Sequence, residues 1–493
     1  MRPLFVAVLL SAALAACSTV ENPVSGKVER TVMDERSEIA TGREQHQQVL
    51  AEYGEVKDAR LQSYVNDIGQ RLARNSHRGQ LDWHFTVVDS PEVNAFALPG
   101  GYIYVTRGLM AYMDSEADLA GVIGHEIGHV TARHGAQRAT RTQTAGLGVL
   151  AATILGAVLE GRGVSGAGDL ASQVSQSVAA GYIASYSREQ ELEADRLGAE
   201  YLARVNYNPT NMVDVIRVLQ DRERFAADEA RAAGRSPSQQ PSWLASHPSN
   251  DQRLRDIQRI ATQYRAAYGE DQRTRYLQMI NGMTFGDSRE QGVIRGRSFY
   301  HEPLGIALTA PAGWKIQNTS QAVALINAEG TAGLVMQAVP ERAGRSHEEI
   351  LRNAVRADQG RSERLSLNGL PATHFSGTRR TEQGQSQPVE VTVVTGPQDR
   401  HYLLLYAGRD AQAVQRAYGA LREAAASFRA MSGSDRLAAR PWTLRSVPYP
   451  RGGFAELARR SPLPVRAVEQ LRLLNGVYAG GEPQPGQLVK VVE

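Results

Sequence analysis

Residues 125–129 read HEIGH, with two histidines four positions apart and a glutamate directly after the first. The residues around this stretch have the apolar period of a helix, with spacings of three and four between Leu119, Val122, Ile123, Ile127 and Val130. Ser115 and Asp118 have the spacing of a capping box at the start of that helix, and Gly135 is its predicted stop. The sequence therefore predicts a helix that contains the whole of HEIGH.

The two histidines can bind one metal ion on such a helix. Residues four apart share a helix face, so the imidazoles of His125 and His129 can point at the same ion. Glu126 lies one residue further round, close enough to bond a water molecule on that ion. A catalytic zinc site needs a third protein ligand and leaves its fourth position to water. The next question is which residue supplies that third ligand.

One scheme takes the third ligand from a histidine ten positions after the first. Position 135 is a glycine here, and His134 misses the required register by one residue. That scheme fails, and His134 is interpreted as a histidine at the helix end.

A second scheme takes a carboxylate from a later helix. Residues 187–203 are strongly helical and carry four acidic side chains. Glu191 and Asp195 share one face of this helix, and Glu189 and Glu193 share roughly the opposite face. One member of a pair could bind zinc while the other orients a ligating histidine through its second ring nitrogen. Without the first motif, four acids on a helix would be interpreted as a solvated surface.

Three motifs in matching order resemble a known family: HEIGH, ELEAD at 191–195, and NAFALPGG at 94–101. Together they resemble the zinc metallopeptidases that include the CAAX prenyl proteases and proteases of outer-membrane assembly, in a soluble lipoprotein branch. The resemblance covers roughly residues 36–265. It implies one Zn²⁺ per chain, with the catalytic base at Glu126, an orienting carboxylate at Asp195, and zinc ligands at His125, His129 and Glu191.

The stretch NAFALPGGYIYVT at 94–106 predicts a strand, a Gly-Gly turn and a second strand. In zinc peptidases of this type, an edge strand beside the metal pairs with the substrate backbone. The expected substrate-binding residues are therefore Asn94, Ala95 and Phe96. The alternative is a hairpin with a structural role alone.

The stretch SHPSNDQR at 246–253 matches a further segment of the family pattern. His247 follows a polar segment, 227–246, that predicts a mobile loop. It could therefore reach the open zinc position and hold the enzyme inactive, or it could act directly in catalysis. Arg253 could contact the substrate or polarise an oxyanion. The alternative for His247 is a histidine at a helix start.

The N-terminus has the pattern of a bacterial lipoprotein. A basic Arg2 precedes an apolar run at 4–16, which is too short to span a bilayer and has the size of a signal-peptide core. LAAC at 14–17 resembles a lipobox, which implies cleavage after residue 16, lipid on Cys17, and a tether over 17–35. Ser18 then suggests the outer membrane, facing the periplasm of a Gram-negative bacterium. The alternative is an ordinary signal peptide with an incidental cysteine.

The overall charge gives no indication of a strongly charged binding partner. The chain carries 55 basic and 52 acidic residues, a net charge of +3, and no basic stripe, so nucleic acid is not expected as a partner. Its length of 493 residues predicts more than one domain. The apolar run at 145–159 predicts a buried helix or hairpin, with a membrane-touching element as the alternative.

The rest of the chain predicts an α+β architecture overall. A mainly helical zinc peptidase domain with a small sheet covers 36–265, a linker follows at 266–299, and short β-type runs with helices predict a second α+β domain at 300–430. Residues 431–493 predict a small C-terminal module that loosely resembles LysM, which would make peptidoglycan a partner.

The expected function is zinc-dependent endopeptidase activity on misfolded or misassembled cell-envelope proteins. In this interpretation the polypeptide substrates are met at the periplasmic face of the outer membrane, where a lipid anchor holds the chain. The alternative is a cell-wall-binding lipoprotein in which the peptidase fold has a scaffold role.

Overall fold

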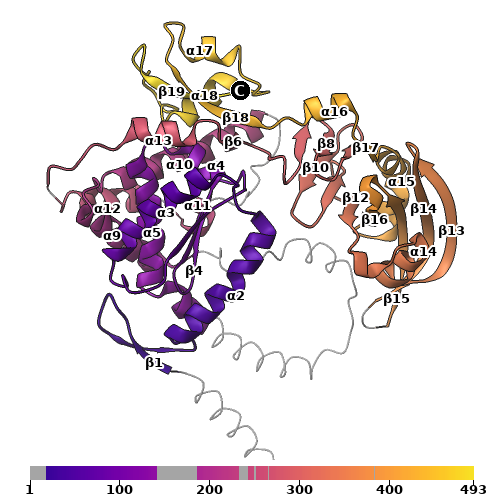
Figure 1. Cartoon of the computed structure of the whole chain (residues 1–493), viewed down its shortest axis with the longest axis horizontal. Coiled ribbons are helices and arrows are strands. Elements are labelled where there is room, and N and C mark those ends of the chain that lie inside the picture. Colours follow the sequence, from indigo (N-terminus) through magenta and orange to yellow (C-terminus); the bar gives the residue numbers. More distant parts are fainter. Residues whose placement is uncertain (1–17, 142–185, 233–242, 249–250, 265, 382–383) are drawn as a thin grey trace, which may run out of the picture. The chain divides into compact units, whose positions relative to one another are not determined.

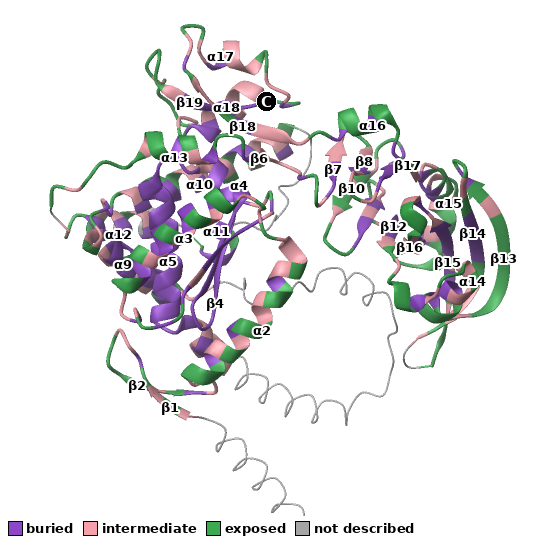
Figure 2. Ribbon diagram, in the orientation of Figure 1, coloured by how far each residue is buried: buried purple, intermediate pink, exposed green. Residues whose placement is uncertain are grey.

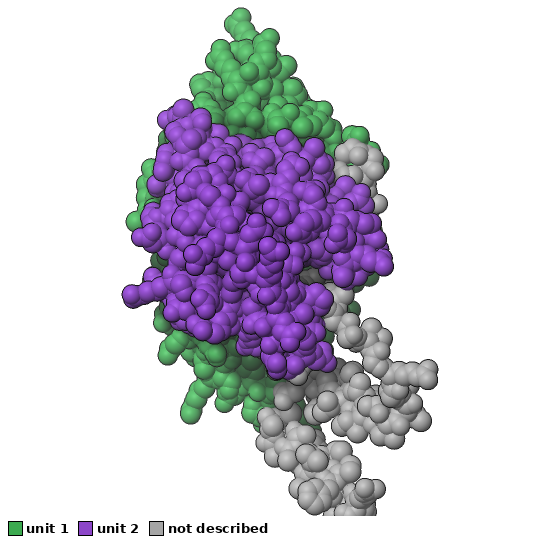
Figure 3. All heavy atoms as spheres, turned by 90° about the vertical axis from the view of Figure 1, so that its right-hand side faces the viewer, with its two compact units in different colours: residues 1–164, 177–285, 442–493 green, residues 165–176, 286–441 purple. Residues whose placement is uncertain are grey.

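The computed structural model describes residues 18–141, 186–232, 243–248, 251–264, 266–381 and 384–493 (Figure 1). Cys17 and the apolar run at 145–159 lie outside the described residues. The chain forms two compact units, coloured separately in Figure 3, and the boundaries between them fall at Phe285/Gly286 and Pro441/Trp442. None of the helices in the described part of the chain combines the length and the apolar character that a bilayer crossing requires.

The first unit is a bundle of helices around the HEIGH helix, α5 (Glu116–Thr131). Its neighbours in the bundle are α3 (Ala59–Arg74), α9 (Arg188–Arg204) and α10 (Asn211–Ala232), and α12 (Asp251–Ala261) packs against α9 and α10. Every residue of α5 is buried, and Figure 2 shows this helix in the centre of the unit. A helix buried on all sides needs neighbours on all sides, which the amphipathic helices around it supply.

A three-stranded sheet lies beside α5, in the order β3 (His84–Val88), β5 (Tyr102–Thr106), β4 (Ala95–Leu98). The predicted strand–turn–strand is confirmed: β4 and β5 are antiparallel, and Gly100 and Gly101 turn between them with φ of 82° and 100°. β4 is an edge strand of this sheet. Helix α2 (Glu35–Tyr53) covers the face of the sheet turned away from α5, where Val49 packs with Phe96, Leu98, Tyr102 and Tyr104.

The segment predicted to be a tether is folded from Ser18 onward. Strands β1 (Ser18–Glu21) and β2 (Val28–Thr31) form an antiparallel hairpin. Asn22, at the hairpin end, is buried, and its side-chain amide donates to the carbonyl of Ala132 just beyond α5. The tether prediction is wrong for these residues, because a polar composition hid a hairpin held by a long-range hydrogen bond.

The predicted linker and the predicted C-terminal module are both parts of larger units. Within 266–299, α13 (Arg273–Ile280) buries Tyr276, Leu277 and Ile280 in the core of the first unit. The described residues up to Phe285 cluster with this unit, and the second unit begins at Gly286 rather than at 300. The second unit also continues to Pro441, so the predicted boundary at 430 lies too early.

Residues 442–493 return to the first unit. They run β18 (Trp442–Pro448), α17 (Gly453–Ala458), α18 (Ala467–Leu474) and β19 (Leu488–Val492), and β18 pairs with both β19 and β6 (Thr284–Phe285). The amine of Lys490, in β19, is fully buried and donates to the carbonyls of Ala111 and Met113, directly before α5. Burial lowers the pKa of Lys490 to about 8. The tail is thus bonded to the loop that leads into the HEIGH helix.

The second unit is the predicted α+β region. Seven antiparallel strands form one sheet, in the order β10 (Lys315–Asn318), β11 (Val323–Ile326), β12 (Ala332–Ala338), β16 (His401–Gly408), β15 (Ser386–Thr395), β14 (Leu370–Arg380) and β13 (Ala357–Leu367). Helix α15 (Ala411–Ala426) packs on one face of this sheet, and α14 (His347–Ile350) packs on the other. A smaller sheet contains β7 (Val293–Arg295), β8 (Ser298–His301), β9 (Ile306–Thr309) and β17 (Arg429–Ala430).

Candidate metal centre

The predicted start of the HEIGH helix is confirmed and its predicted end is wrong. The Ser115 hydroxyl accepts from the amide of Asp118, whose carboxylate accepts from the amide of Ser115, and this forms the capping box. The helix ends at Thr131, four residues before Gly135, because Arg133 turns the chain with a φ of 60°. Helical structure resumes at 134, so Gly135 lies inside the next helical segment.

Helix α9 brings the acidic residues against α5 through contacts between small residues. Gly124 and Gly128 of α5 face Gly198 and Ala194 of α9. A Cβ atom at position 128 would lie 2.9 Å from the carbonyl oxygen of Ala194, which is too close for any side chain. The two backbones are therefore in direct contact, and α9 can place a short carboxylate side chain beside the histidines of α5.

Four buried side chains converge on one point: His125, His129, Glu191 and His247. The Nε2 atoms of His125 and His129 are 3.0 Å apart, and Glu191 Oε1 lies 3.4 Å from His129 Nε2. Glu191 Oε2 lies 3.6 Å from His125 Nε2. His247 Nδ1 is 3.2 Å from His125 Nε2 and 3.0 Å from Glu191 Oε1. Each of the four side chains is at most 2% exposed.

These distances fit a single zinc ion. Ligand atoms about 2.0–2.1 Å from a tetrahedral zinc lie roughly 3.3 Å from one another, and the four side chains have that spacing. Burial holds the pKa of His129 well below its usual range, so its imidazole is neutral. Burial opposes ionisation of Glu191, but His247 and His129 outweigh that cost and lower its pKa. Neutral imidazole and charged carboxylate are the forms that bind a metal ion.

A second layer of side chains fixes the ligands. Asp195 Oδ1 lies 2.8 Å from His125 Nδ1, which leaves the opposite ring nitrogen for the ion. Arg253 donates to both carboxylate oxygens of Asp195, at 2.8 and 2.9 Å, and its Nη1 lies 2.9 Å from Glu191 Oε2. It also donates to the backbone carbonyl of His247. Arg253 is 4% exposed, so this position favours the orientation of ligands over the substrate contact expected from the sequence.

His134 also belongs to this second layer. Its Nδ1 is 2.9 Å from His129 Nδ1, and its Nε2 is 3.2 Å from Glu193 Oε2. The interpretation of His134 as a simple helix-end histidine is therefore wrong, because its fully buried ring connects the ligand His129 to Glu193. Between the two acidic pairs, Glu191 and Asp195 face the metal centre. Glu193 faces His134 instead, and Glu189 is exposed at the start of α9.

One carboxylate oxygen of Glu126 accepts a hydrogen bond, and the other has no hydrogen-bond partner among the described residues. Its Oε1 accepts from the indole nitrogen of Trp243 at 3.0 Å and lies 3.5 Å from His247 Nε2. Its Oε2 is buried and has no hydrogen-bond partner among the described residues. A buried carboxylate oxygen without a partner is costly, and a water molecule beside the metal would satisfy it.

Two aromatic residues at the centre were not predicted. Trp243 begins the short helix α11 (Trp243–Ser246), and its ring stacks on His247 with centroids 4.6 Å apart. Tyr186 precedes α9 and stacks on His129 at 3.9 Å. The predicted loop at 227–246 is wrong at both ends, because α10 continues to Ala232 and α11 starts at Trp243. The one sequence feature that could have marked Trp243 as a site residue is the apolar Trp-Leu pair in an otherwise polar stretch.

The residues predicted to bind substrate lie at the start of β4. Ala95 and Phe96 are in the strand, and Asn94 directly precedes it. Asn94 is 1% exposed, yet neither its side-chain oxygen nor its side-chain nitrogen has a hydrogen-bond partner among the described residues. The amide of Trp243 donates to the carbonyl of Val93, which places α11 at this end of the strand.

A helix with HExxH, a glutamate ligand from a second helix, and an edge strand alongside define a zinc metallopeptidase domain. Residues 59–261 match the family model described as peptidase family M48. The chain is 29% identical over 276 residues to the β-barrel assembly-enhancing protease of Yersinia pestis, a match that covers 52% of this chain and 54% of that protein. It is 31% identical over 222 residues to the protease of the same name from Escherichia coli K12, covering 45% and 43%.

The chain is also similar to a mitochondrial metalloendopeptidase. The metalloendopeptidase OMA1 of Schizosaccharomyces pombe is 29% identical over 221 residues, a match that covers 43% of this chain and 58% of that protein. The chain spans about half the length of the curated relatives it matches. A solved structure of Synechocystis CyanoP covers 30% of this chain at 12% identity and a TM-score of 0.19, too low to assign a fold. Residues 59–261 therefore carry a zinc metallopeptidase domain of the M48 type, similar to that of the β-barrel assembly-enhancing proteases.

We expect Gly128→Ala to weaken zinc binding at least tenfold. The new Cβ would meet the carbonyl oxygen and Cα of Ala194, at 2.9 and 3.1 Å, and backbone atoms cannot rotate away. Helix α9 would have to shift, and with it Glu191 and the orienting Asp195. Loss of such an orienting partner typically costs about 10–100-fold in metal affinity. Competition with a chromophoric chelator measures the affinity. The matched control is Gly419→Ala in α15, where no atom lies within 4 Å of the new Cβ. Wild-type zinc affinity in Gly128→Ala would contradict the expectation.

Proposed function

We propose that the protein is a zinc-dependent endopeptidase that hydrolyses peptide bonds in misfolded or misassembled proteins of the cell envelope. The observation that carries the proposal is the buried metal centre with an unbound oxygen of Glu126 beside it. A scaffold has no use for three buried ligands, their orienting partners and a carboxylate held ready to accept a proton.

The reaction follows from the positions of these side chains. Bound zinc would supply Lewis acidity to a water molecule and to the carbonyl group of the scissile bond. Glu126 accepts the proton of that water on Oε2 and passes it to the leaving amine. Its other oxygen stays bonded to the indole of Trp243, which keeps the carboxylate in place through both transfers. Asp195 and Arg253 hold His125 and Glu191 in position.

The substrate backbone is proposed to pair with the free edge of β4. No strand among the described residues occupies that edge. Asn94 supports this proposal. Its side-chain oxygen and nitrogen are both buried without hydrogen-bond partners, which costs free energy, and a bound peptide would supply those partners. A peptide group offers one N–H donor and one carbonyl acceptor, which are the two partners that Asn94 lacks. Such pairing gives affinity with little sequence choice.

His247 is proposed to hold the enzyme in a closed state. Its Nδ1 completes a set of four protein ligand atoms. A zinc ion with four protein ligands has no position for water, as in structural zinc sites. Stacking on Trp243 and the bond from Arg253 to its carbonyl stabilise this position. Activity would require a substrate or a partner to displace His247 from the metal.

The proposed location is the periplasmic face of the outer membrane. Lipid on Cys17 would anchor the chain, and the relatives named for β-barrel assembly suggest envelope proteins as substrates. The alternative is a cell-wall-binding lipoprotein with a scaffold role. The strand–helix–helix–strand order of 442–493 favours it, because that tail has the elements expected of a LysM-like module.

Glu126→Gln should abolish hydrolysis of casein while zinc is retained. The amide fills the same space and can still accept from Trp243, but it cannot take a proton; removal of a general base costs about 100-fold or more. Zinc content and casein cleavage, wild type against variant, form the test. A variant with more than a tenth of the wild-type rate would mean that another residue is the base. If the wild-type protein neither bound zinc nor cleaved casein, the result would favour the alternative, in which the fold has a scaffold role.

His247→Ala should raise basal proteolysis and keep zinc, because His125, His129 and Glu191 remain. The measurement is the rate of casein cleavage together with the zinc content, and self-cleavage is followed on a gel. Loss of activity with zinc retained would refute the closed-state role. In that case His247 would act in substrate or transition-state binding.

Labelling with a lipid precursor in the host bacterium should mark the wild-type chain, and Cys17→Ser should be unlabelled and leave the membrane fraction. Loss of the acyl chains removes the proposed anchor, and no helix of the described residues is long and apolar enough to cross a bilayer in its place. Fractionation followed by immunoblotting measures the distribution. Retention of Cys17→Ser in the membrane fraction would point instead to the apolar run at 145–159.

A further inference from the structure

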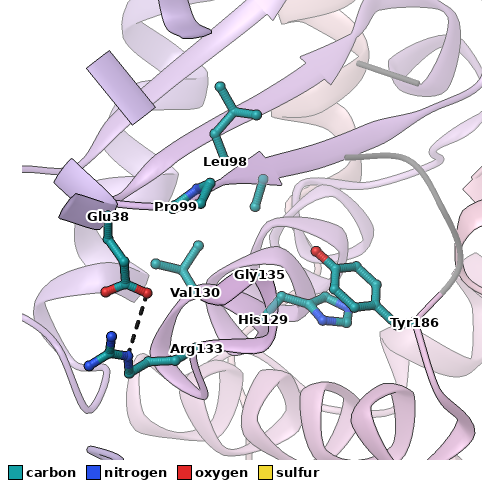
Figure 4. Close-up of a pocket in the computed structure, with 9 residues that line it drawn as sticks. Glu38, Leu98, Pro99, His129, Val130, Arg133, Gly135 and Tyr186 are labelled. Carbon is teal, nitrogen blue, oxygen red and sulfur yellow. Dashed lines mark ion pairs between the residues drawn. The ribbon is translucent and has the colours of Figure 1, made fainter. Parts of the chain in front are cut away.

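A pocket lies next to the metal centre, and Figure 4 shows the residues that line it. It is at the end of β4 opposite Val93, which bonds Trp243. Its walls are Leu98 and Pro99 at the end of the strand, Val130 and Gly135 around the end of α5, and the ring of Tyr186. The ligand His129 also lines it. We propose that this pocket receives the side chain of one small aliphatic substrate residue, such as alanine or valine, within two residues of the scissile bond. The inference rests on the proposed peptidase function.

The position of the pocket follows the path that a bound peptide would take. At the start of β4, Val93 accepts a hydrogen bond from Trp243, which also bonds Glu126. At the end of β4 lie Leu98 and the pocket, with His129 in its wall. A peptide paired with the free edge of β4 passes the metal centre between these two ends. Since side chains of an extended chain alternate in direction, one residue near the scissile bond points toward the pocket.

The lining favours an apolar side chain. Leu98, Pro99 and Val130 contribute aliphatic groups, and Tyr186 contributes a ring held by stacking on His129 at 3.9 Å.

The charged residues of the pocket are already compensated. Arg133 Nε lies 3.5 Å from Glu38 Oε1, and Arg133 Nη2 donates to the carbonyl of Met33. Glu38 also binds Arg78 at 3.0 Å. The dashed ion pair in Figure 4 therefore closes one side of the pocket without requiring an opposite charge from the substrate.

Gly135 supplies the space in the pocket. A Cβ atom at this position would meet a single atom within 4 Å, Pro99 Cγ at 3.4 Å. A Cβ atom here therefore meets the Pro99 wall of the pocket and no backbone atom, so substitution of Gly135 takes up pocket space. Gly135 is helical and has no positive φ, so other residues can adopt its conformation. The open space in the pocket is about 10 Å³, room for a group about the size of a methyl and not for an aromatic ring.

The experiment compares peptides that differ at one position. Cleavage sites of the wild-type enzyme in β-casein are mapped by mass spectrometry. Peptides of one such site then carry glycine, alanine, valine or phenylalanine at each position within two residues of the cut. At one of these positions, we expect kcat/KM for alanine and valine to exceed that for phenylalanine at least tenfold. Gly135→Leu should lower kcat/KM for alanine and valine tenfold or more, and for glycine less than threefold. Gly135→Ala should change the values in the same direction by less.

Binding gives a second readout that needs no turnover. In a Glu126→Gln background, fluorescence anisotropy of labelled peptides should give the same order of Kd values, with and without Gly135→Leu. Asn94→Ala is the matched contrast: its partner is the peptide backbone, so it should weaken all four peptides alike. Gly419→Ala, in α15, should leave the profile unchanged.

Two outcomes would overturn the pocket assignment. One is an equal loss for all four peptides in Gly135→Leu with zinc retained, and the other is an unchanged ranking. A wild-type enzyme that cleaves nothing would instead refute the proposed peptidase function. The anisotropy measurement, made with the four residues placed at each position of an uncleaved β-casein peptide, would still test the pocket.

Discussion

The backbone contact between α5 and α9 is the constraint on which the metal centre depends. Glycines at 124 and 128 face Ala194 and Gly198, so no side chain separates the two helices. Only at that separation can Glu191 lie within 3.4–3.6 Å of the histidine nitrogens. Asp195 lies one turn further along α9 and reaches the other side of His125 through the same contact. The ligand set is thus a consequence of packing as much as of the motif residues.

That packing creates a dense group of buried ionisable side chains, which carries a cost in free energy. Burial disfavours every charge in the group, yet Glu191 and Asp195 are held ionised by their neighbours. Among the residues that the structure describes, Arg253 is the one permanently charged cation that contacts both carboxylates. A divalent ion among the four ligand atoms would add the missing positive charge. Metal binding and the stability of this core are therefore linked.

Much of the centre could be predicted from the sequence because helical spacing is local. The period around HEIGH, the capping box at Ser115 and the shared face of Glu191 and Asp195 depend only on residues a few positions apart. The bond from His134 to Glu193 and the stacking of Trp243 on His247 join distant segments and leave no spacing to detect. The errors in the predicted domain boundaries have the same cause. β18 pairs with β6, although the whole second unit lies between them in the sequence.

The two ends of β4 give the proposed closed state and the proposed pocket a common physical basis. His247 and Trp243 lie at the start of the strand, and the pocket lies at its end. A peptide along this edge would gain free energy from Asn94, from main-chain pairing and from a side chain in the pocket. A ligand shifts a conformational equilibrium only by its difference in affinity for the two states. If His247 blocks the peptide path, those contacts are made in the open state alone. The free energy that selects a substrate would then also displace His247 from the metal.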